Sequence, residues 1–362
     1  MPKIQGKTVC NVVDTILDWI ENGECPLGKN IGTEQALAAM FQVSRTTIRR
    51  ATRYLMEEKR LLRVHGGGFE ASPSEGTAAK KNKSRTKLLL IRAADNPLNN
   101  EVFEGVMNSP LAANYDIIVL DGAGKYGNYA EILNTLPDDV RNVLLFPLDI
   151  PEVKNAITAA LKRGVHIVQL DRFLDDVEAP SVMFDNYLGG SVAVSHLLKE
   201  TSLPVYYFGY TLSPTSAVKR YEAWHNTMLE FGYENSDDYL VCRVAREESD
   251  FYSSNYKIML DDFFARHPEE IAIFAVCDTL AKLVYSCGEA AGHTIGKDLF
   301  VVGFDNLALC ERLVPQLSSV YVNRKLLGTE ALKILHEGTK ISSWRQLLPV
   351  EMIIRESSRR QG

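Results

Sequence analysis

The amino-terminal part of the chain carries apolar residues at the 3.6-residue period of an α-helix. One face of the first predicted helix consists of Val9, Val12, Val13, Ile16, Leu17 and Ile20. Asn22 and Gly23 follow this face and are typical of helix ends, and residues 26–28 predict a loop. The pattern therefore predicts an amphipathic helix that packs against a small core.

A second and a third helix follow, and each has a hydroxyl residue that can cap its amino end. Thr33 can cap the second helix and Ser44 the third. The predicted core positions are Leu37, Ala38 and Phe41 in the second helix and Ile48, Ala51 and Leu55 in the third. Residues 61–64 and 69–71 then flank glycines and predict a β-hairpin. This order is that of a winged helix-turn-helix, which places one helix in the DNA major groove.

The third predicted helix also has a basic face. Arg45, Arg49 and Arg53 recur every four residues along it, and Thr46 and Arg50 lie beside them. A charged helix face is usually just solvated, but in the sequence only the glutamates at 57–58 lie nearby to neutralise this one. Arginine near a helix start can donate two hydrogen bonds to guanine, and hydroxyls suit phosphate oxygens. The pattern favours DNA contact.

From about residue 88 onward, short apolar runs alternate with helical stretches. The runs begin near residues 88, 117, 143, 166, 205, 271 and 299. Continuous Val, Ile, Leu and Phe runs are typical of buried parallel strands, and their alternation with helices predicts a doubly wound sheet. The number of runs predicts two such sheets side by side.

Polar residues follow many of these runs. They are Asp171, Arg172, Asp185, Asn186, Arg220, Asp278, Asp305 and Asn306. Ligands of doubly wound folds bind at the carboxyl ends of strands, so these residues are candidate ligand contacts, with Phe103, Phe173 and Trp224 as candidate stacking rings. Each residue alone is more often a helix cap or loop residue. Their repetition at equivalent strand ends favours a polyhydroxylated ligand, which carboxylates and rings can bind.

Charge divides the chain into a basic head and an acidic body. Residues 1–87 hold 15 Lys and Arg against 9 Asp and Glu, whereas the remainder holds 25 against 37. A basic first domain suits a polyanionic partner. We expect a DNA-binding domain at residues 1–71, a flexible basic linker at 72–87, and an effector-binding domain at 88–362.

Several functional classes have no support in the sequence. No apolar stretch is long enough to span a bilayer, and residues 1–20 lack the order of a signal peptide, so we expect a cytoplasmic protein without a membrane partner. The six cysteines are scattered and lack metal-ligand spacing, so neither a metal nor a cofactor is expected. No GxSxG, Walker or HExxH motif is present, and we expect no catalytic residues.

Residues 8–70 resemble the GntR-type winged-helix family through the stretches ALAAMF, VSRTTIRRA and EEKRLLRVHGGG. The candidate DNA-binding residues that follow from the helix faces and from this resemblance are Thr33, Gln35, Ser44, Arg45, Thr46, Thr47, Arg49, Arg50, His65, Gly66 and Gly67. Two positions depart from the family pattern. Gln35 replaces an arginine at the start of the second helix, and Gly67 replaces a basic residue of the wing.

Residues 88–357 resemble the LacI-type regulator domain, which is related to periplasmic sugar-binding proteins. The matching stretches are QLDRF at 169, VMFDNYLGGSVAVSHLL at 182, SAVKRYEAWH at 216, FAVCDTLA at 274, VVGFDN at 301 and LSSVYVNRKLLGTEAL at 317. The resemblance implies an α/β domain of two subdomains joined by three crossings, an effector in the cleft, and a dimer. It places effector contacts on Asp171, Arg172, Arg220, Asp278 and Asp305, with Asn100, Phe103, Phe184 and Trp224 lining the cleft. Cys277 and Ala223 replace a family asparagine and glycine.

A GntR-type head on a LacI-type body resembles the arabinose repressors of Gram-positive bacteria. This resemblance implies a homodimeric repressor that binds a double-stranded DNA operator and responds to a small sugar-like effector. Two alternatives remain open: a regulator whose body answers to a protein partner or a non-sugar metabolite, and a sugar-acting enzyme.

Overall fold

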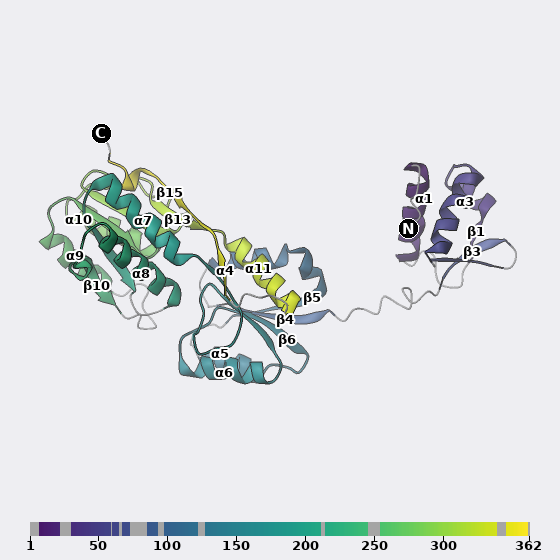
Figure 1. Ribbon diagram of the computed structural model, residues 1–362, viewed down its shortest axis with the longest axis horizontal. Helices are drawn as coiled ribbons and strands as arrows, with labels where there is room; N and C mark the ends of the chain where they lie inside the picture. Colours follow the sequence, from purple (N-terminus) through teal and green to yellow (C-terminus); the bar gives the residue numbers. More distant parts are fainter. Residues whose placement is uncertain are drawn as a thin grey trace. The chain divides into compact units, whose positions relative to one another are not determined.

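The computed structural model describes residues 7–21, 30–58, 60–64, 67–72, 85–92, 98–121, 127–210, 214–244, 254–338 and 345–360. The chain forms two compact units, Met1–Ser84 and Arg85–Gly362, which we call the head and the body (Figure 1). Residues 73–84 of the predicted linker lie outside the described part, and the first strand of the body already begins at Thr86. Among the described residues, no helix is both long and apolar enough to cross a membrane.

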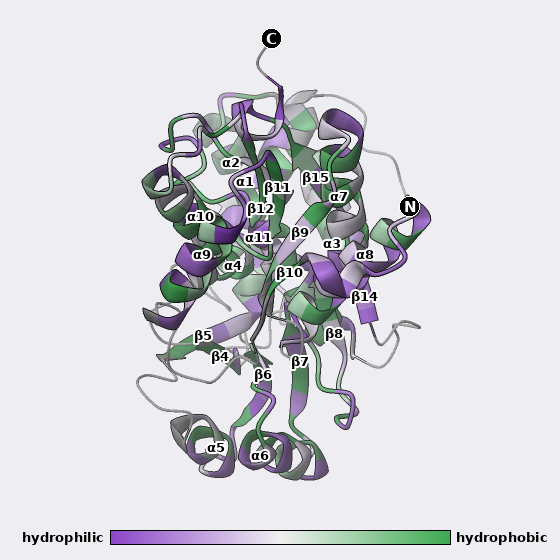
Figure 2. Cartoon of the chain, turned by 90° about the vertical axis from the view of Figure 1, so that its left-hand side faces the viewer, coloured by the Kyte–Doolittle hydropathy of each residue, from purple (hydrophilic) through white to green (hydrophobic). Residues whose placement is uncertain are grey.

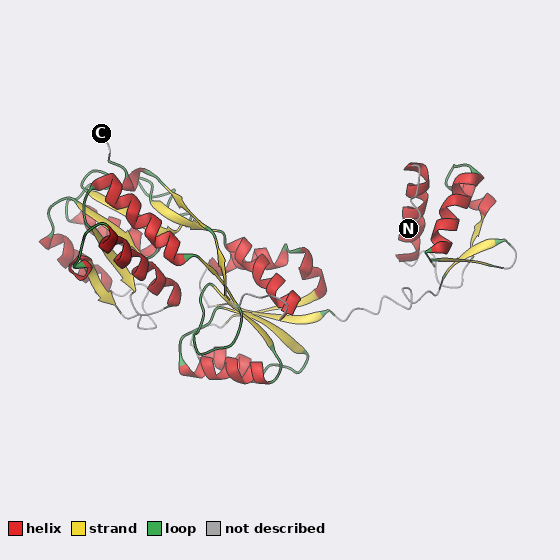
Figure 3. Cartoon of the chain, viewed as in Figure 1, coloured by secondary structure: helices red, strands yellow, loops and turns green. Residues whose placement is uncertain are grey.

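The described part of the head contains three helices and a small sheet, which Figure 3 shows in red and yellow. Its elements are α1 (Lys7–Glu21), β1 (Asn30–Thr33), α2 (Glu34–Met40), α3 (Arg45–Glu57), β2 (Leu61–Arg63) and β3 (Gly68–Ala71). The hairpin of β2 and β3 confirms the predicted wing, and both pairings are antiparallel in the order β1-β3-β2. Strand β1 was not predicted, because its four residues carry no clear apolar alternation.

One apolar core holds the head together. Its buried side chains are Val9, Val12, Val13, Ile16 and Ile20 of α1, Leu37 and Ala38 of α2, Ile48, Ala51 and Leu55 of α3, and Leu61, Phe69 and Ala71 of the hairpin. The predicted inward faces of all three helices are thereby confirmed, with Leu17 and Phe41 only partly buried. The wing is therefore anchored to the same core as α3.

The first subdomain of the body is built on a parallel six-stranded sheet of order β14-β8-β7-β6-β4-β5. The strands are β4 (Thr86–Arg92), β5 (Tyr115–Asp121), β6 (Val140–Leu145), β7 (His166–Leu170), β8 (Ser181–Phe184) and β14 (Arg345–Leu348). The helical elements are α4 (Leu98–Met107), the 3-10 helix η1 (Pro110–Asn114), α5 (Gly127–Asn134), α6 (Pro151–Lys162) and α11 (Arg324–Glu337). Helices α5 and α6 lie side by side along the sheet (Figures 1 and 2).

Burial on both faces explains the continuous apolar runs. In β4, Leu88 and Leu90 join the core that includes Val102 of α4, whereas Leu89 and Ile91 join a separate core with Tyr129 of α5. Successive strand side chains point to opposite faces, so a strand covered on both sides must be apolar at every position. The run at 88 therefore predicted a parallel strand correctly.

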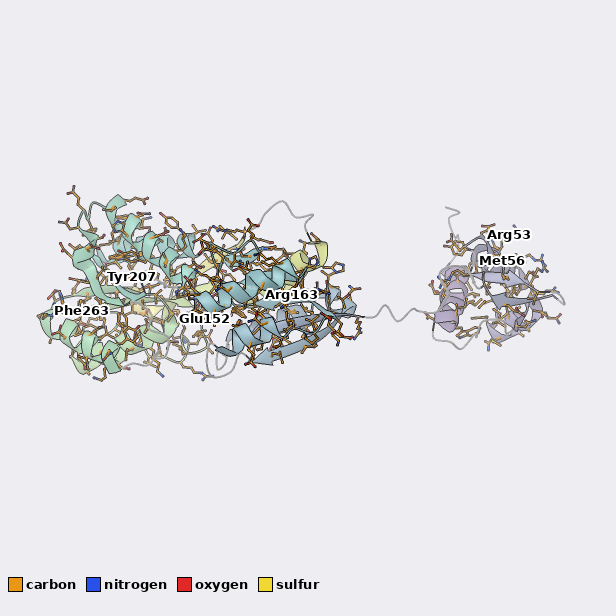
Figure 4. The ribbon with its side chains drawn as sticks, turned by 90° about the horizontal axis from the view of Figure 1, so that it is seen from below. Arg53, Met56, Glu152, Arg163, Tyr207 and Phe263 are labelled. Atoms are coloured by element: carbon orange, nitrogen blue, oxygen red, sulfur yellow. The ribbon has the colours of Figure 1, made fainter. Side chains whose placement is uncertain are left out.

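The second subdomain has a six-stranded sheet of order β10-β9-β11-β12-β13-β15, in which only β15 is antiparallel to its neighbour. The strands are β9 (Val205–Tyr210), β10 (Leu240–Val244), β11 (Ile271–Ala275), β12 (Leu299–Asp305), β13 (Ser318–Val322) and β15 (Val350–Ile353). The helical elements are α7 (Asn186–Thr201), α8 (Thr215–Glu230), η2 (Ser236–Tyr239), α9 (Ser254–Arg266), α10 (Asp278–Ala290) and η4 (Glu356–Ser358). Tyr207 and Phe263 are two of its buried aromatic residues (Figure 4).

The chain passes between the subdomains three times, as the family resemblance implied. It crosses between β8 and α7, between β13 and α11, and between β14 and β15. The first and third crossings are joined by a hydrogen bond of 2.9 Å from the Asp185 amide to the Leu348 carbonyl. The two sheets are therefore connected by neighbouring segments at one boundary.

Two glycines let α4 and α11 pack backbone to backbone. A Cβ atom at Gly105 would overlap the Lys325 carbonyl, and one at Gly328 would overlap the Val102 carbonyl. The Thr329 hydroxyl also donates a hydrogen bond of 3.1 Å to the Gly105 carbonyl. The crossing into α11 is thereby held firmly in the first subdomain.

We predict that Gly328→Ala destabilises the body by about 1–3 kcal/mol, because the added methyl forces two packed helices apart. Urea unfolding of the body should show a lower midpoint. Ser286→Ala, at an exposed position of α10, is the control and should change the free energy of unfolding by less than about 0.5 kcal/mol. An unchanged midpoint for Gly328→Ala would contradict the close packing.

Candidate DNA-binding and effector sites

Helix α3 begins where the sequence predicts, at a serine cap. The backbone of Ser44 is extended, and its hydroxyl oxygen accepts a hydrogen bond of 3.1 Å from the Thr47 amide. The Ser44 and Thr47 hydroxyls lie 2.8 Å apart. Thr33 caps α2 in the same way, by accepting from the Ala36 amide at 3.3 Å. Both predicted caps are confirmed, and they fix the amino ends of the two helices that form the helix-turn-helix.

The polar face of α3 is open to solvent while its opposite face is buried. The exposed side chains are Arg45, Thr46, Arg49, Arg50 and Arg53, with Thr47 half-buried. Arg53 lies at the surface of the head (Figure 4). Thr33 and Gln35 are exposed at the start of α2. The exposed side chains of α3 therefore form a basic face, which is the arrangement that major-groove readout requires.

An acidic residue of α2 lies within this basic surface. Arg49 donates from Nε and Nη2 to one carboxylate oxygen of Glu34, at 3.2 and 2.9 Å. The hydrogen bond from Arg49 holds the pKa of the Glu34 carboxyl below its usual value, and the charges of Arg63 and Arg45 act in the same direction. The sequence prediction that only residues 57–58 could neutralise the arginines is therefore wrong.

The wing tip is described only in part. His65 and Gly66 lie outside the described residues. Gly67 is exposed and has a φ of +90°, a backbone conformation that side chains disfavour, and no atom lies within 4 Å of a Cβ built on it. A glycine at this position therefore suits the turn itself, whatever the wing contacts.

In the body, two predicted contacts lie on strained backbone at strand ends. Asp171 directly follows β7 and has a φ of +66°, and Asp305 ends β12 with a φ of +105°. Asn306 follows with a φ of +46°. Positive φ at non-glycine residues costs free energy and often marks functional sites. The two positions belong to different subdomains.

The Asp305 carboxylate lies beside two buried arginines. Arg220 Nη2 and Arg324 Nη2 lie 3.6 and 3.3 Å from its Oδ1 atom. Arg220 also donates to the Asn186 side chain at 2.8 Å and to the Val276 carbonyl at 2.7 Å. Arg324 donates to the Asp305 carbonyl at 3.1 Å. These contacts fix the guanidinium of Arg220, which the sequence predicted as an effector contact.

Asp278 lies deeper than the other charged residues. Its side chain is fully buried, and its two oxygens accept from the Leu307 amide at 2.7 Å and from the Ser319 hydroxyl at 2.5 Å. Burial raises the pKa of its carboxyl to about 7, and the charge of Asp305 adds to the rise. From its buried position, Asp278 therefore fixes the loop that follows β12.

Contacts between the subdomains bring these residues into one cluster. Burial raises the pKa of Asp305, and the charge of Asp171 in the other subdomain adds to the rise. The Thr215 hydroxyl of α8 lies 3.3 Å from both the amide and the carbonyl of Phe173, which follows β7. Arg172 Nη2 lies 3.4 Å from Asp171. Residues from the carboxyl ends of both sheets therefore face one another.

Sequence reasoning missed one member of this cluster. Asn186 was among the candidate ligand contacts at the strand ends, but Arg324 was not singled out. Arg324 begins α11 and reaches toward Glu101 of α4, at 3.9 Å. Its position two residues after the end of β13 is the signal that could have found it, had the polar-edged strand SSVYV been predicted.

The aromatic predictions fare differently. Phe184 is buried at the end of β8, Phe103 packs half-buried against the core, and Asn100 is exposed on α4. The prediction that Trp224 lines the cleft is wrong. Its side chain is fully buried, and its indole nitrogen donates to the Val205 carbonyl at 2.7 Å. Val205 is the first residue of β9, so Trp224 lies near the amino-terminal ends of the strands. The cluster lies at their carboxyl ends.

Phe173 and Cys277 also interact mainly with other parts of the protein. The guanidinium of Arg345 lies 3.7 Å from the ring centre of Phe173, so this ring already has a stacking partner. Burial raises the pKa of the Cys277 thiol to about 12. The described residues contain no group of three or more His, Cys, Asp or Glu side chains placed to hold a metal ion.

Two family models match the chain. Residues 8–70 match "Bacterial regulatory proteins, gntR family", and residues 195–358 match "Periplasmic binding protein-like domain". Curated relatives include a PurR transcriptional repressor of Photobacterium profundum, 23% identical over 336 residues that cover 90% of this chain and 98% of the relative. A ribose operon repressor of Haemophilus influenzae is 22% identical and covers 86% of this chain and 92% of the relative.

The chain is a transcriptional regulator with a GntR-type head and a periplasmic-binding-protein-like body.

Solved structures confirm the fold of this regulator. A transcriptional regulator CelR–cellobiose complex matches it with a TM-score of 0.65 and 19% identity, over 90% of this chain and 99% of the other. A LacI family regulator from Enterococcus faecium with bound ribose matches with a TM-score of 0.60 and 21% identity, over 76% and 100%. The predicted combination of a winged helix-turn-helix and a two-subdomain α/β body is thereby confirmed.

We predict that the regulator loses stability as pH rises through the raised pKa of Asp278, and that Asp278→Asn reduces this loss. Between its ordinary pKa of 3.8 and the raised value of about 7, the folded carboxyl keeps a proton that the unfolded chain has lost. The free energy of unfolding should therefore fall with rising pH by up to about 1.4 kcal/mol per pH unit from this group. The fall is complete above the raised pKa.

Urea unfolding at about pH 5 and about pH 7 measures this effect. The wild type should lose more stability across the interval than Asp278→Asn, since other groups, such as His196, titrate in both proteins. Asp262→Asn, on the exposed surface of α9, should behave like the wild type. Equal pH dependence in all three proteins would show that Asp278 is ionised throughout.

Proposed function

We propose that this regulator is a homodimeric repressor that binds a double-stranded DNA operator through α3 and the wing. A small sugar-like effector binds between the two subdomains of the body and releases the operator. The observation that carries the proposal is the cluster around Asp305, which gathers charged residues from both subdomains at the carboxyl ends of their strands. The exposed arginines of α3 supply the DNA-binding half.

The effector would bridge the two subdomains. Asp171 and Arg172 offer an acceptor and a donor from the first, and Asp305 and Arg220 offer the same pair from the second. Hydroxyl groups both donate and accept, so a polyhydroxylated molecule could replace parts of the internal ion pairs. A ligand that contacts both sides favours the arrangement in which they are close. A coupling of about 1–3 kcal/mol would suffice to change operator occupancy.

The identity of the relatives supports a sugar over other ligands and a regulator over an enzyme. Two of the matching structures contain cellobiose and ribose, and the named curated relatives are repressors. We therefore place the chain among non-enzymatic regulators and, as a DNA-binding protein of bacterial type, in the cytoplasm. A body that answers to a protein partner has no observation in its favour.

An exposed strand edge supports the homodimer. Strand β5 lies at the end of its sheet, and Ile118, Val119 and Leu120 expose 36–38% of their surface there. Met107 of α4 exposes 47%. Edge strands with exposed apolar side chains are prone to pair with another chain. We propose that this edge is part of the interface between two copies.

We predict that Arg49→Ala weakens operator binding by about 1–3 kcal/mol, the value of a good bidentate contact to a base. The probe is a duplex that the wild-type protein enriches from a random pool, and binding is measured by fluorescence anisotropy. Arg266→Ala, which removes the same charge from an exposed position of the body, should bind as the wild type does. Unchanged binding by Arg49→Ala would remove α3 from the proposed role.

We predict that one or more pentoses, hexoses or disaccharides stabilise the wild-type protein in a thermal-shift screen. A sugar at 100 times its dissociation constant adds about 2.7 kcal/mol. Asp171→Asn should lose most of that shift, and asparagine tolerates the positive φ of this position. If no sugar shifts the wild type, the effector is a non-sugar metabolite or a protein.

A further inference from the structure

Glu34 is an acidic residue beside the arginines of the basic surface of the head. It is the first residue of α2, and its side chain is only 13% exposed, whereas that of Arg49 is 60% exposed. Arg45, Arg49 and Arg63 all favour its charged form. The two residues are 15 positions apart in the sequence, and the turn between α2 and α3 brings them together. An acid at this place repels DNA phosphates, so its presence there needs an explanation.

The geometry of the ion pair shows which donors of Arg49 remain available. A guanidinium has five N–H groups, on Nε, Nη1 and Nη2. Glu34 takes the edge formed by Nε and Nη2, with both donating to the same carboxylate oxygen. The remaining edge, formed by Nη1 and Nη2, lies at the tip of an exposed side chain. Two parallel donors at the tip match the O6 and N7 acceptors of guanine in the major groove.

We propose that Glu34 is a positioning residue that fixes the Arg49 guanidinium for reading a base. The proposal rests on the DNA-binding function proposed above. An arginine that neutralises phosphate gains nothing from an adjacent carboxylate, because that carboxylate weakens its field. An arginine that reads a base gains a fixed plane and loses less side-chain freedom when it binds. Glu34 therefore contributes to sequence discrimination and opposes general affinity for DNA.

A positioning role and a simple charge effect predict different changes in DNA affinity when the charge of Glu34 is removed. Glu34→Gln keeps the size of the side chain and removes the negative charge. A charge effect alone would raise affinity for every DNA sequence in parallel. Loss of positioning would lower the ratio of specific to non-specific affinity by about 2- to 12-fold, the factor associated with ordering one flexible side chain. Non-specific affinity would stay equal or rise.

The experiment uses the full-length protein and two duplexes. One is a sequence that the wild type enriches from a random pool, and the other is the same duplex with its bases shuffled. Binding is measured for the wild type, Glu34→Gln, Arg49→Ala and the double variant, over a range of salt concentrations. Glu57→Gln is the matched control, because it removes the same charge from an exposed position of α3 that lies about two turns beyond Arg49.

The expected result has three parts. Glu34→Gln lowers the affinity ratio while Glu57→Gln leaves it unchanged. In the Arg49→Ala background, Glu34→Gln has no further effect on the ratio, because its role passes through Arg49. Arg49→Ala leaves the salt dependence of shuffled-duplex binding unchanged, whereas loss of a phosphate contact would reduce the slope of log K against log salt by about 0.9.

Three results would overturn the inference. They are a parallel rise in both affinities for Glu34→Gln, an equal fall in the ratio when Arg49 is already alanine, and a smaller salt slope for Arg49→Ala. Thermal unfolding of Glu34→Gln should also show a folded head, so that a change in the ratio is not a loss of structure. Failure of the wild type to enrich any sequence would instead contradict the DNA-binding function itself.

Discussion

The carboxylate of Asp305 lies between two buried guanidinium groups at the place where the two subdomains meet. Buried charges are costly unless they are paired and hydrogen-bonded, so this group of three constrains everything around it. Arg220 is fixed to α7 through Asn186 and to β11 through the carbonyl that follows that strand. Arg324 is fixed to the first turn of α11. A change at Asp305 therefore acts on helices of both subdomains.

The backbone around Asp305 is held in an unfavourable conformation by the same neighbourhood. The positive φ values at Asp305 and Asn306 persist because several groups form hydrogen bonds with this loop. Asp278 accepts from the Leu307 amide, Ser319 accepts from the Asn306 amide, and Arg355 donates to the Asn306 side chain. Strain of this kind is stored where the surrounding structure fixes one conformation. An effector that competes for Asp305 would find its geometry already set.

The head uses electrostatics in a different way. Its arginines are exposed, so water and salt screen them, and their value lies in which groups they can reach. Caps at Thr33 and Ser44 fix the two helices, and the Glu34–Arg49 pair fixes one guanidinium between them. A small apolar core shared by α3 and the wing fixes the positions of these two elements relative to each other. Local geometry in the head thus depends on caps and one ion pair above a single core.

The sequence alone determined the three helices and the wing of the head, the apolar central strands of the body, the division into head and body, and the basic face of α3, but not short or polar-edged strands such as β1 and β13. These follow from periodicity, capping residues and charge, which are local properties. Which side chains meet was decided by the tertiary structure, because contacts between Arg49 and Glu34, or between Arg324 and Asp305, depend on how distant elements pack. Trp224 shows the limit clearly. It is only four residues after Arg220 on α8, but this helix leads away from the carboxyl ends of the strands. One helical turn is therefore enough to place its ring in the core instead of the site.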